Sequence, residues 1–254
     1  ILLFYLLITK QFEKMAWPRV KRNIIMSFMM IVLGNGLTTF SEKYISSGLA
    51  SLISTLSPLC VLVLNLSLGF EKPSLKIFIG ILLGVGGIYL IYQNNLADFF
   101  NPDYRLGIAA ILLAVVIWSA GTIYSKKISD HPGNMLVNLC FQMLFAGLFM
   151  LIAQFIIQPD VHFYQWSRSS IIAVIYLAIF GSLIGYAAYL YALSKLPSTK
   201  VSVFTYINAV VALVLGWLIL NEKITLKIIL AAILIIGGVI VANYRKAPPL
   251  PAKK

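Results

Sequence analysis

Small polar side chains recur along the long apolar runs of this sequence, at spacings that place them on single helical faces. Steps of three, four and seven residues return to the same face because an α-helix has about 3.6 residues per turn. Such a face could bind a small solute inside a membrane through hydroxyl and amide hydrogen bonds. The face in the run 46–70 carries Ser47, Ser51, Ser54, Pro58 and Asn65, and Ser198, Ser202 and Thr205 occupy the corresponding places of a later run.

Larger polar and aromatic side chains mark the neighbouring runs. Asn35 and Thr38 share one face, and the matching positions later in the chain are Tyr186 and Tyr189. Trp118 lies in the middle of the run 105–126, where it is either the wall of a cavity or a packing residue. The candidate substrate-binding residues are Asn35, Thr38, Thr39, Ser51, Ser54, Thr55, Trp118, Ser119, Tyr186, Tyr189, Thr205, Tyr206 and Asn208, with Pro58 as a hinge or kink in its helix.

Each hydroxyl also has a second interpretation, because Ser and Thr in membrane helices bond to their own backbone or allow close helix packing. This second interpretation is favoured for any one Ser or Thr taken alone. The recurrence of the stripes in both halves of the chain favours a polar cavity. Asn138 and Gln142 lie one turn apart, and we expect them to form hydrogen bonds between helices.

No Asp, Glu, Lys, Arg or His lies near the centre of any apolar run, and the motifs HExxH, GxSxG and DxxxD do not occur. A membrane-embedded enzyme would need paired acids, a metal cluster or a nucleophile and base at depth. We therefore predict no catalytic residue, no metal site and no cofactor. The expected ligand is a small molecule held without a fixed counter-charge, either a small zwitterion or a solute that stacks on the aromatic rings.

Length and composition restrict the class of protein. Of the 254 residues, 60% are hydrophobic and 11% are charged, and the mean hydropathy is +0.93. A soluble domain has about 25% charged residues, so this chain cannot cover itself with polar surface. Cys60 and Cys140 are the only cysteines, which excludes a disulfide scaffold. Because the basic residues lie between apolar runs, we expect a lipid bilayer and no nucleic acid as the partner.

Eight runs are long enough to cross a hydrocarbon core, which takes about 20 helical residues. The run 1–9 is too short, and we expect it to be the end of a helix whose beginning is absent, so that the sequence is N-terminally truncated. Of the 20 basic residues, 15 fall on one side, which the positive-inside rule assigns to the cytoplasm together with the C-terminus. The eight runs are 23–44, 46–70, 74–92, 105–126, 134–157, 170–194, 199–220 and 224–243.

An internal repeat relates the two halves of the chain. At an offset of 151 residues, EKPSLKI at 71–77 aligns with EKITLKI at 222–228, and Gly86 and Gly87 align with Gly237 and Gly238. The charge distribution puts the first EK on the cytoplasmic side and the second outside, so the copies face opposite ways. Inverted repeats are the architecture of many secondary transporters, whose substrate site lies where the repeats meet.

The expected fold class is therefore an all-α polytopic membrane protein of two inverted five-helix repeats. The intact protein would have ten helices, of which about eight full spans and a partial one are visible. The first repeat, 1–92, lacks its first helix and most of its second, and an external connector covers 93–106. The second repeat covers 107–243, and a basic cytoplasmic tail covers 244–254.

The segment 46–91, with its A-S-L run, mid-helix Pro, Glu at the helix end and GG pair, resembles the EamA family of the drug/metabolite transporter superfamily. The segment 200–241 resembles the same template, so the resemblance covers essentially the whole chain. It implies two inverted five-helix repeats, cytoplasmic termini and a central cavity used for alternating access. Helices one, three, four, six, eight and nine would line that cavity, which implicates the regions around Asn35, Ser54, Trp118, Tyr186 and Tyr206.

The resemblance and the polar stripes together predict a secondary transporter or exporter of amino acids or related small metabolites in the bacterial cytoplasmic membrane. A membrane scaffold or assembly partner without transport activity is the alternative. The glycines of the fifth and tenth helices are expected to form a scaffold or homodimer contact rather than a substrate contact. These glycines are Gly80, Gly84, Gly86, Gly87, Gly237 and Gly238.

Overall fold

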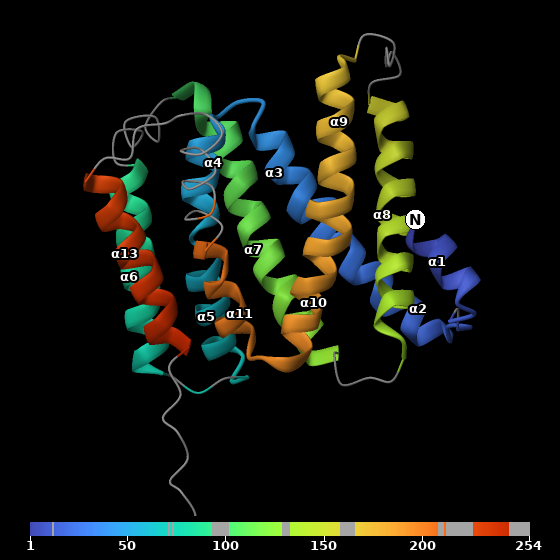
Figure 1. The fold of residues 1–254 in the computed structure, drawn as a ribbon, viewed down its shortest axis with the longest axis horizontal. Coiled ribbons are helices and arrows are strands. Elements are labelled where there is room, and N and C mark those ends of the chain that lie inside the picture. Colours follow the sequence, from blue (N-terminus) through green and yellow to red (C-terminus); the bar gives the residue numbers. More distant parts are fainter. Residues whose placement is uncertain are drawn as a thin grey trace, which may run out of the picture.

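A computed structural model describes residues 1–11, 13–70, 72, 74–92, 102–128, 133–157, 166–207, 211 and 226–243. Within these ranges the chain is helical and contains no strand (Figure 1). The elements in chain order are α1 (Leu2–Ile8), α2 (Trp17–Met26), η1 (Ser27–Asn35), α3 (Gly36–Ser41), α4 (Ser47–Ser54), α5 (Ser57–Ser67), α6 (Leu75–Tyr92), η3 (Pro102–Tyr104), α7 (Arg105–Ile128), α8 (Met135–Ile157), α9 (Arg168–Tyr176), η5 (Leu177–Gly185), α10 (Tyr186–Lys195), α11 (Ser198–Val203) and α13 (Leu226–Asn243).

Helices dominate because a backbone in lipid must satisfy its own hydrogen bonds within each segment. Four continuous helices are long and apolar enough to cross a membrane, and the described part adds three shorter apolar helices. Three of the long ones join more than one element, since α2, η1 and α3 are continuous, as are η3 and α7, and α9, η5 and α10. The four are Trp17–Ser41, Pro102–Lys127, Met135–Ile156 and Arg168–Lys195.

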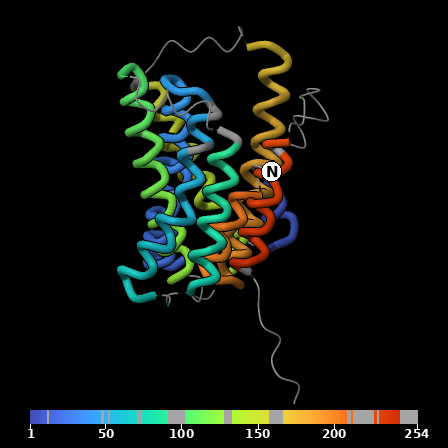
Figure 2. The backbone as a smooth tube through the Cα atoms, turned by 90° about the vertical axis from the view of Figure 1, so that its left-hand side faces the viewer, coloured from blue at the N-terminus to red at the C-terminus, as the bar shows by residue number. Residues whose placement is uncertain are grey.

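The bundle is arranged around α7, which contacts η1, α3, α4 and α5. Figure 1 shows α6 and α13 at one edge of the bundle and α1, α2 and α8 at the other. The end at which α7 stops and α8 begins carries Lys126, Lys127 and Lys195, and is called the basic end below. At the opposite end α9 stands apart from the other helices (Figure 2). Its residues are exposed.

The helices α6 and α13 pack closely and run antiparallel, as inverted repeats require. A Cβ atom added to Gly80 would lie 2.6 Å from the carbonyl oxygen of Gly238, and one added to Gly87 would lie 2.7 Å from that of Ala231. The residue numbers thus rise along one helix as they fall along the other. The predicted scaffold contact exists within one chain at Gly80, Gly84, Gly87 and Gly238. Gly86 and Gly237 have no such neighbour within 4 Å.

Both repeats contain a nine-residue π-helical segment at matching positions. These segments are η1 and η5, and adding the repeat offset of 151 to Ser27–Asn35 gives 178–186, one residue from the observed Leu177–Gly185. π-Helical turns are rare and occur often at functional sites. The internal symmetry therefore extends from the sequence to an irregular feature of the backbone.

The run 46–70 contains two helices, separated by a turn at residues 55–56. Helix α4 ends at Ser54, and α5 begins at Ser57 with Pro58 in its first turn. Proline fits the first turn because its missing N–H would have no helical partner there. Pro58 therefore lies in the first turn of α5, and its role as a hinge or kink stays a prediction.

Candidate substrate-binding site

Two aromatic rings and a hydroxyl from α7 and α10 meet at mid-bundle. The rings of Trp118 and Tyr189 lie 5.5 Å apart at 48°, and the Thr122 hydroxyl lies 2.6 Å from the Tyr189 hydroxyl. Thr122 donates its single proton to the carbonyl oxygen of Trp118 at 2.9 Å. Tyr189 must therefore be the donor to Thr122, which fixes the orientation of the phenol.

The first repeat touches this group through Gly34 of η1. A Cβ atom at Gly34 would lie 2.9 Å from Cε3 of Trp118, so only a residue without a side chain lets the indole approach so closely. Trp118 is half-buried between η1 and Tyr189. Packing thus explains part of its position, and it lies where the two repeats meet.

Tyr186 begins a chain of buried hydrogen bonds that joins α10, α8 and α2. Its hydroxyl donates to Oε1 of Gln142 at 3.0 Å, and Nε2 of Gln142 donates to Oδ1 of Asn23 at 2.8 Å. Nδ2 of Asn23 then donates to Oδ1 of Asn138 at 3.0 Å. The predicted interhelical hydrogen bonds of Asn138 and Gln142 are confirmed.

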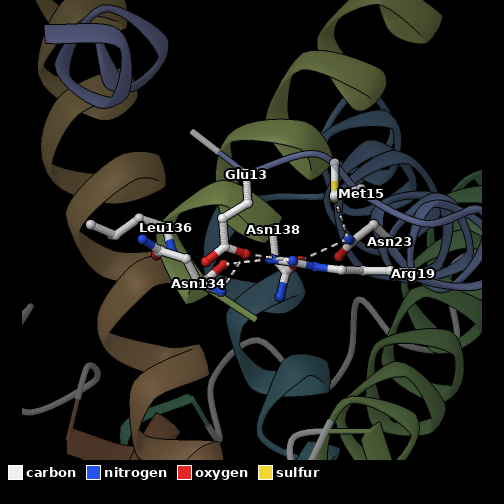
Figure 3. Close-up of polar contacts among 7 residues, drawn as sticks. All are labelled: Glu13, Met15, Arg19, Asn23, Asn134, Leu136 and Asn138. Carbon is white, nitrogen blue, oxygen red and sulfur yellow. Dashed lines mark hydrogen bonds and ion pairs between the residues drawn. The ribbon is translucent and has the colours of Figure 1, made fainter. Parts of the chain in front are cut away.

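At the basic end the chain of hydrogen bonds reaches an ion pair (Figure 3). Nε of Arg19 donates to Oδ1 of Asn138 at 2.7 Å, and Nη1 of Arg19 lies 2.7 Å from Oε2 of Glu13. The backbone N–H of Asn134 donates to the same carboxylate at 3.2 Å. The hydrogen bond from Arg19, followed by that from Asn134, lowers the pKa of Glu13 below its ordinary value.

Arg19 and Asn23 are not among the predicted site residues, although their spacing along the sequence indicates a shared helical face. Arg19, Asn23 and Ser27 are spaced by four residues, and so are Asn134, Asn138 and Gln142. One polar stripe lies on α2 and the other on α8. Because their spacing is equal, each side chain of one stripe can pair with one of the other when the helices run parallel. Ser27 adds a further bond by donating to the backbone carbonyl of Gln142 at 2.7 Å. The hydrogen-bonded series from Glu13 and Arg19 through Asn138, Asn23 and Gln142 to Tyr186 is called the ladder below.

Several predicted hydroxyls bond to their own helix instead. Thr38 donates to the carbonyl of Gly34 at 2.8 Å, and Ser54 donates to that of Ala50 at 2.9 Å. For these two residues the backbone interpretation describes the structure. Ser119 and Thr55 are buried, and the Ser119 hydroxyl lies 3.5 Å from that of Ser57. The remaining predicted residues of the first repeat are exposed, namely Asn35, Thr39 and Ser51.

The structure separates Tyr206 from the group around Trp118. Tyr206 is fully buried in the cluster of α6, α11 and α13, where its ring packs directly on Gly84. Its hydroxyl has no hydrogen-bond partner among the described residues. Thr205 is half-buried beside it, and Asn208 lies outside the described residues.

A cavity of about 390 Å³ opens at the basic end between α5, α7, α10 and α11. Its walls bring together helix ends from both repeats. Among the residues that line it are Asn65, Phe70, Lys126, Lys127, Lys195 and Ser198.

The fold and this site together define a polytopic membrane protein in which inverted repeats meet at aromatic, hydroxyl and amide side chains. The chain belongs to the EamA-like transporter family, which matches residues 1–93 and 105–244.

Two relatives and one solved structure illustrate the match. The chain is 30% identical over 194 residues to the uncharacterized inner membrane transporter YedA of Escherichia coli, covering 76% of this chain and 60% of YedA. It is 24% identical over 225 residues to the uncharacterized transporter YoaV of Bacillus subtilis, covering 89% of this chain and 76% of YoaV. A protein crystal structure that is 23% identical shares the fold, with a TM-score of 0.74 over 91% of this chain and 77% of the other.

Proposed function

We propose that this protein is a secondary transporter that exports amino acids or related small metabolites by alternating access. The observation that supports it most is the contact between the repeats at Trp118. There Gly34 of one repeat meets a ring pair of the other, beside hydroxyl and amide groups. Secondary transporters with inverted repeats bind substrate at this kind of interface.

The residues at this interface suit an uncharged or zwitterionic solute. Trp118 and Tyr189 offer ring faces for stacking or for a cationic group. The Tyr189 hydroxyl donates to Thr122, which fixes the phenol beside the Trp118 ring. Asn35 ends η1 one residue beyond Gly34, and its exposed amide adds a donor and an acceptor.

Movement between two access states would need helices that bend at matching places. The paired π segments η1 and η5 are suited to this role, because a π turn loosens the regular backbone hydrogen bonding of a helix. Trp118 packs against the end of η1, and Tyr186 directly follows η5. Bending at either segment would therefore change the site itself.

Flux measurements in proteoliposomes test the proposal. Uptake and efflux are screened against amino acids with the wild type, and then with Tyr189→Phe and Asn35→Ala. Both variants are expected to lower flux without lowering the yield of folded protein. Tyr191→Phe is the matched control, because Tyr191 lies on the same helix with its side chain exposed. Wild-type flux in both variants would remove these residues from the site, and absence of flux for every solute in a folded protein would favour a scaffold.

We also propose that the basic end and the C-terminus face the cytoplasm of a bacterial inner membrane. The support is the distribution of basic residues, 15 of 20 on one side. In a background without Cys60 and Cys140, a cysteine in place of Ser74 should react with an impermeant reagent only from the cytoplasm. A cysteine in place of Thr225, the repeat-related position, should react only from outside. Labelling of both from the same side would contradict the proposed topology.

A further inference from the structure

The cavity at the basic end is lined by three lysines from two helices of the second repeat. Lys126 and Lys127 lie in the last turn of α7, and Lys195 is the last residue of α10. We propose that this cavity is a vestibule that binds an oxyanion, a carboxylate or phosphate group, before the solute enters the site between the repeats. The role of the vestibule in transport rests on the proposed function, whereas the binding of an oxyanion does not.

The local sequence builds the wall that faces these lysines. Gly69 has φ +67°, a conformation that favours glycine, and it ends α5 with Phe70 N–H bonded to the carbonyl of Asn65 at 3.0 Å. This tight turn holds the Phe70 ring at the edge of the cavity, with Nζ of Lys127 5.3 Å from its centre. The attraction between a cation and a ring face favours this position of the Lys127 ammonium group beside Phe70.

The inner part of the cavity is polar and comes from both repeats. Nδ2 of Asn65 on α5 donates to the hydroxyl of Ser198 on α11 at 2.8 Å, and both residues are buried. The cavity therefore has ammonium groups at its rim and a hydrogen-bonded amide and hydroxyl further in. Among the described residues that line it there is no carboxylate.

The chemistry of the walls selects the class of ligand. Lysine ammonium groups are compact donors that bind carboxylate and phosphate oxygens by charge-assisted hydrogen bonds. A volume of about 390 Å³ is within the range of small-molecule sites and suits a solute of metabolite size. A cationic rim also raises the local concentration of anionic solutes and so their rate of entry. The oxyanion is the group of the solute that this vestibule recognises.

The lysines have a simpler explanation, since cations are favoured at helix C-termini and on the cytoplasmic side of membrane proteins. That explanation predicts no saturable binding at the cavity. Two sources of an oxyanion also need to be separated, because a lipid headgroup at the membrane surface has the same chemistry as a free solute.

Direct binding to the full chain in nanodiscs of phosphatidylcholine decides between these explanations. Succinate and inorganic phosphate are titrated by calorimetry against the wild type, the triple variant Lys126→Gln, Lys127→Gln, Lys195→Gln, and the single variant Lys127→Gln. The control is Lys10→Gln, Lys14→Gln, Lys21→Gln, which removes the same charge from exposed positions outside the cavity. Thermal melting checks that each variant is folded, and the single variant serves if the triple variant is not.

We expect saturable binding of at least one probe, weakened by added sodium chloride. The affinity should fall by at least about tenfold in the triple variant, since each charge-assisted bond is worth roughly that factor or more, and should be unchanged in the control. A second series uses nanodiscs with phosphatidylglycerol. If lipid is the natural occupant, this lipid will compete with the soluble probes and co-purify with the wild type but not with the triple variant. Binding that does not saturate, or that is equal in all variants, would overturn the proposal.

Flux measured separately keeps this inference distinct from the proposed function. Loss of all flux with lysine-dependent binding intact would refute transport and leave the vestibule in place. Normal flux and normal flux affinity of an anionic solute in the triple variant would refute the vestibule and leave transport in place.

Discussion

The hydrogen bond between Tyr186 and Gln142 offers a quantitative test of the hydrogen-bond chain that reaches the first repeat through Asn23. Tyr186, Gln142 and Asn23 are 7%, 2% and 3% exposed, so water cannot replace a lost partner. Gln142→Met keeps the size of the side chain but leaves the Tyr186 hydroxyl with only Sδ of Met30, 3.6 Å away, as an acceptor, and leaves Oδ1 of Asn23 without its donor. Tyr186→Phe removes only the first of these two bonds.

The magnitudes follow from the energies of side-chain hydrogen bonds between membrane helices, which average about 0.6 kcal/mol and reach about 1.7 kcal/mol. Gln142→Met should therefore lower the free energy of unfolding by about 1–3 kcal/mol, and Tyr186→Phe by about 0.6–1.7 kcal/mol. The double variant should cost less than the sum of the two, because the shared bond is lost only once. The coupling energy should be about 0.6–1.7 kcal/mol.

Reversible unfolding in mixed detergent and SDS micelles, followed by near-ultraviolet circular dichroism, measures these differences. Met143→Leu is the control, since Met143 lies next to Gln142 on α8, is half-buried and takes no part in the ladder. Strictly additive costs of the two substitutions would show that the hydroxyl and the amide do not interact, and would refute the continuous ladder from Arg19 to Tyr186.

Three further substitutions test other contacts. Gly34→Ala places a Cβ 2.9 Å from Trp118 and should cost about 1–3 kcal/mol of stability as an overpacked contact, with altered tryptophan emission as the second readout; an unchanged melting curve and spectrum would contradict the contact. Gly84→Val should destabilise the protein more than Gly86→Val in a thermal melt, because Gly84 lies directly against the Tyr206 ring whereas Gly86 has no neighbour within 4 Å. Because Arg19 lowers the pKa of Glu13 below 4.5, the ion pair stabilises the fold above that pH, and this stabilisation is lost as the pH falls through the lowered pKa. At neutral pH the melting temperature of the wild type should therefore be higher than that of Glu13→Gln, and this difference should disappear on acidification. A difference in melting temperature that persists in strong acid would argue against the ion pair.

The interhelical ladder shows how close sequence reasoning came to a feature of the site. Asn138 and Gln142 were recognisable as interhelical donors, because an amide in hydrocarbon needs a partner. Their partners were not identified, since Arg19 and Asn23 lie about 115 residues away and spacing along one helix does not reveal which helix is adjacent. Only the parallel packing of α2 on α8 brings the two stripes into register.

The stripe of hydroxyls shows the reverse case. Thr38 and Ser54 lie on the predicted faces, but their protons are used by carbonyls one turn earlier. Tyr206 and Tyr189 are both predicted substrate-binding residues. The structure puts one against a glycine of α6 and the other against Trp118, because the packing of each helix decides which face meets which neighbour.

The sequence by itself determined the membrane environment, the inverted repeat and the EamA-like family. Hydropathy, charge placement and the 151-residue self-similarity depend only on the order of residues along the chain. Tertiary structure decided the rest. The hydrogen bonds from Glu13 to Tyr186 and the lysine-lined cavity depend on contacts between helices distant in the chain. An apolar helix has many faces of similar composition, and only packing selects the face that is used.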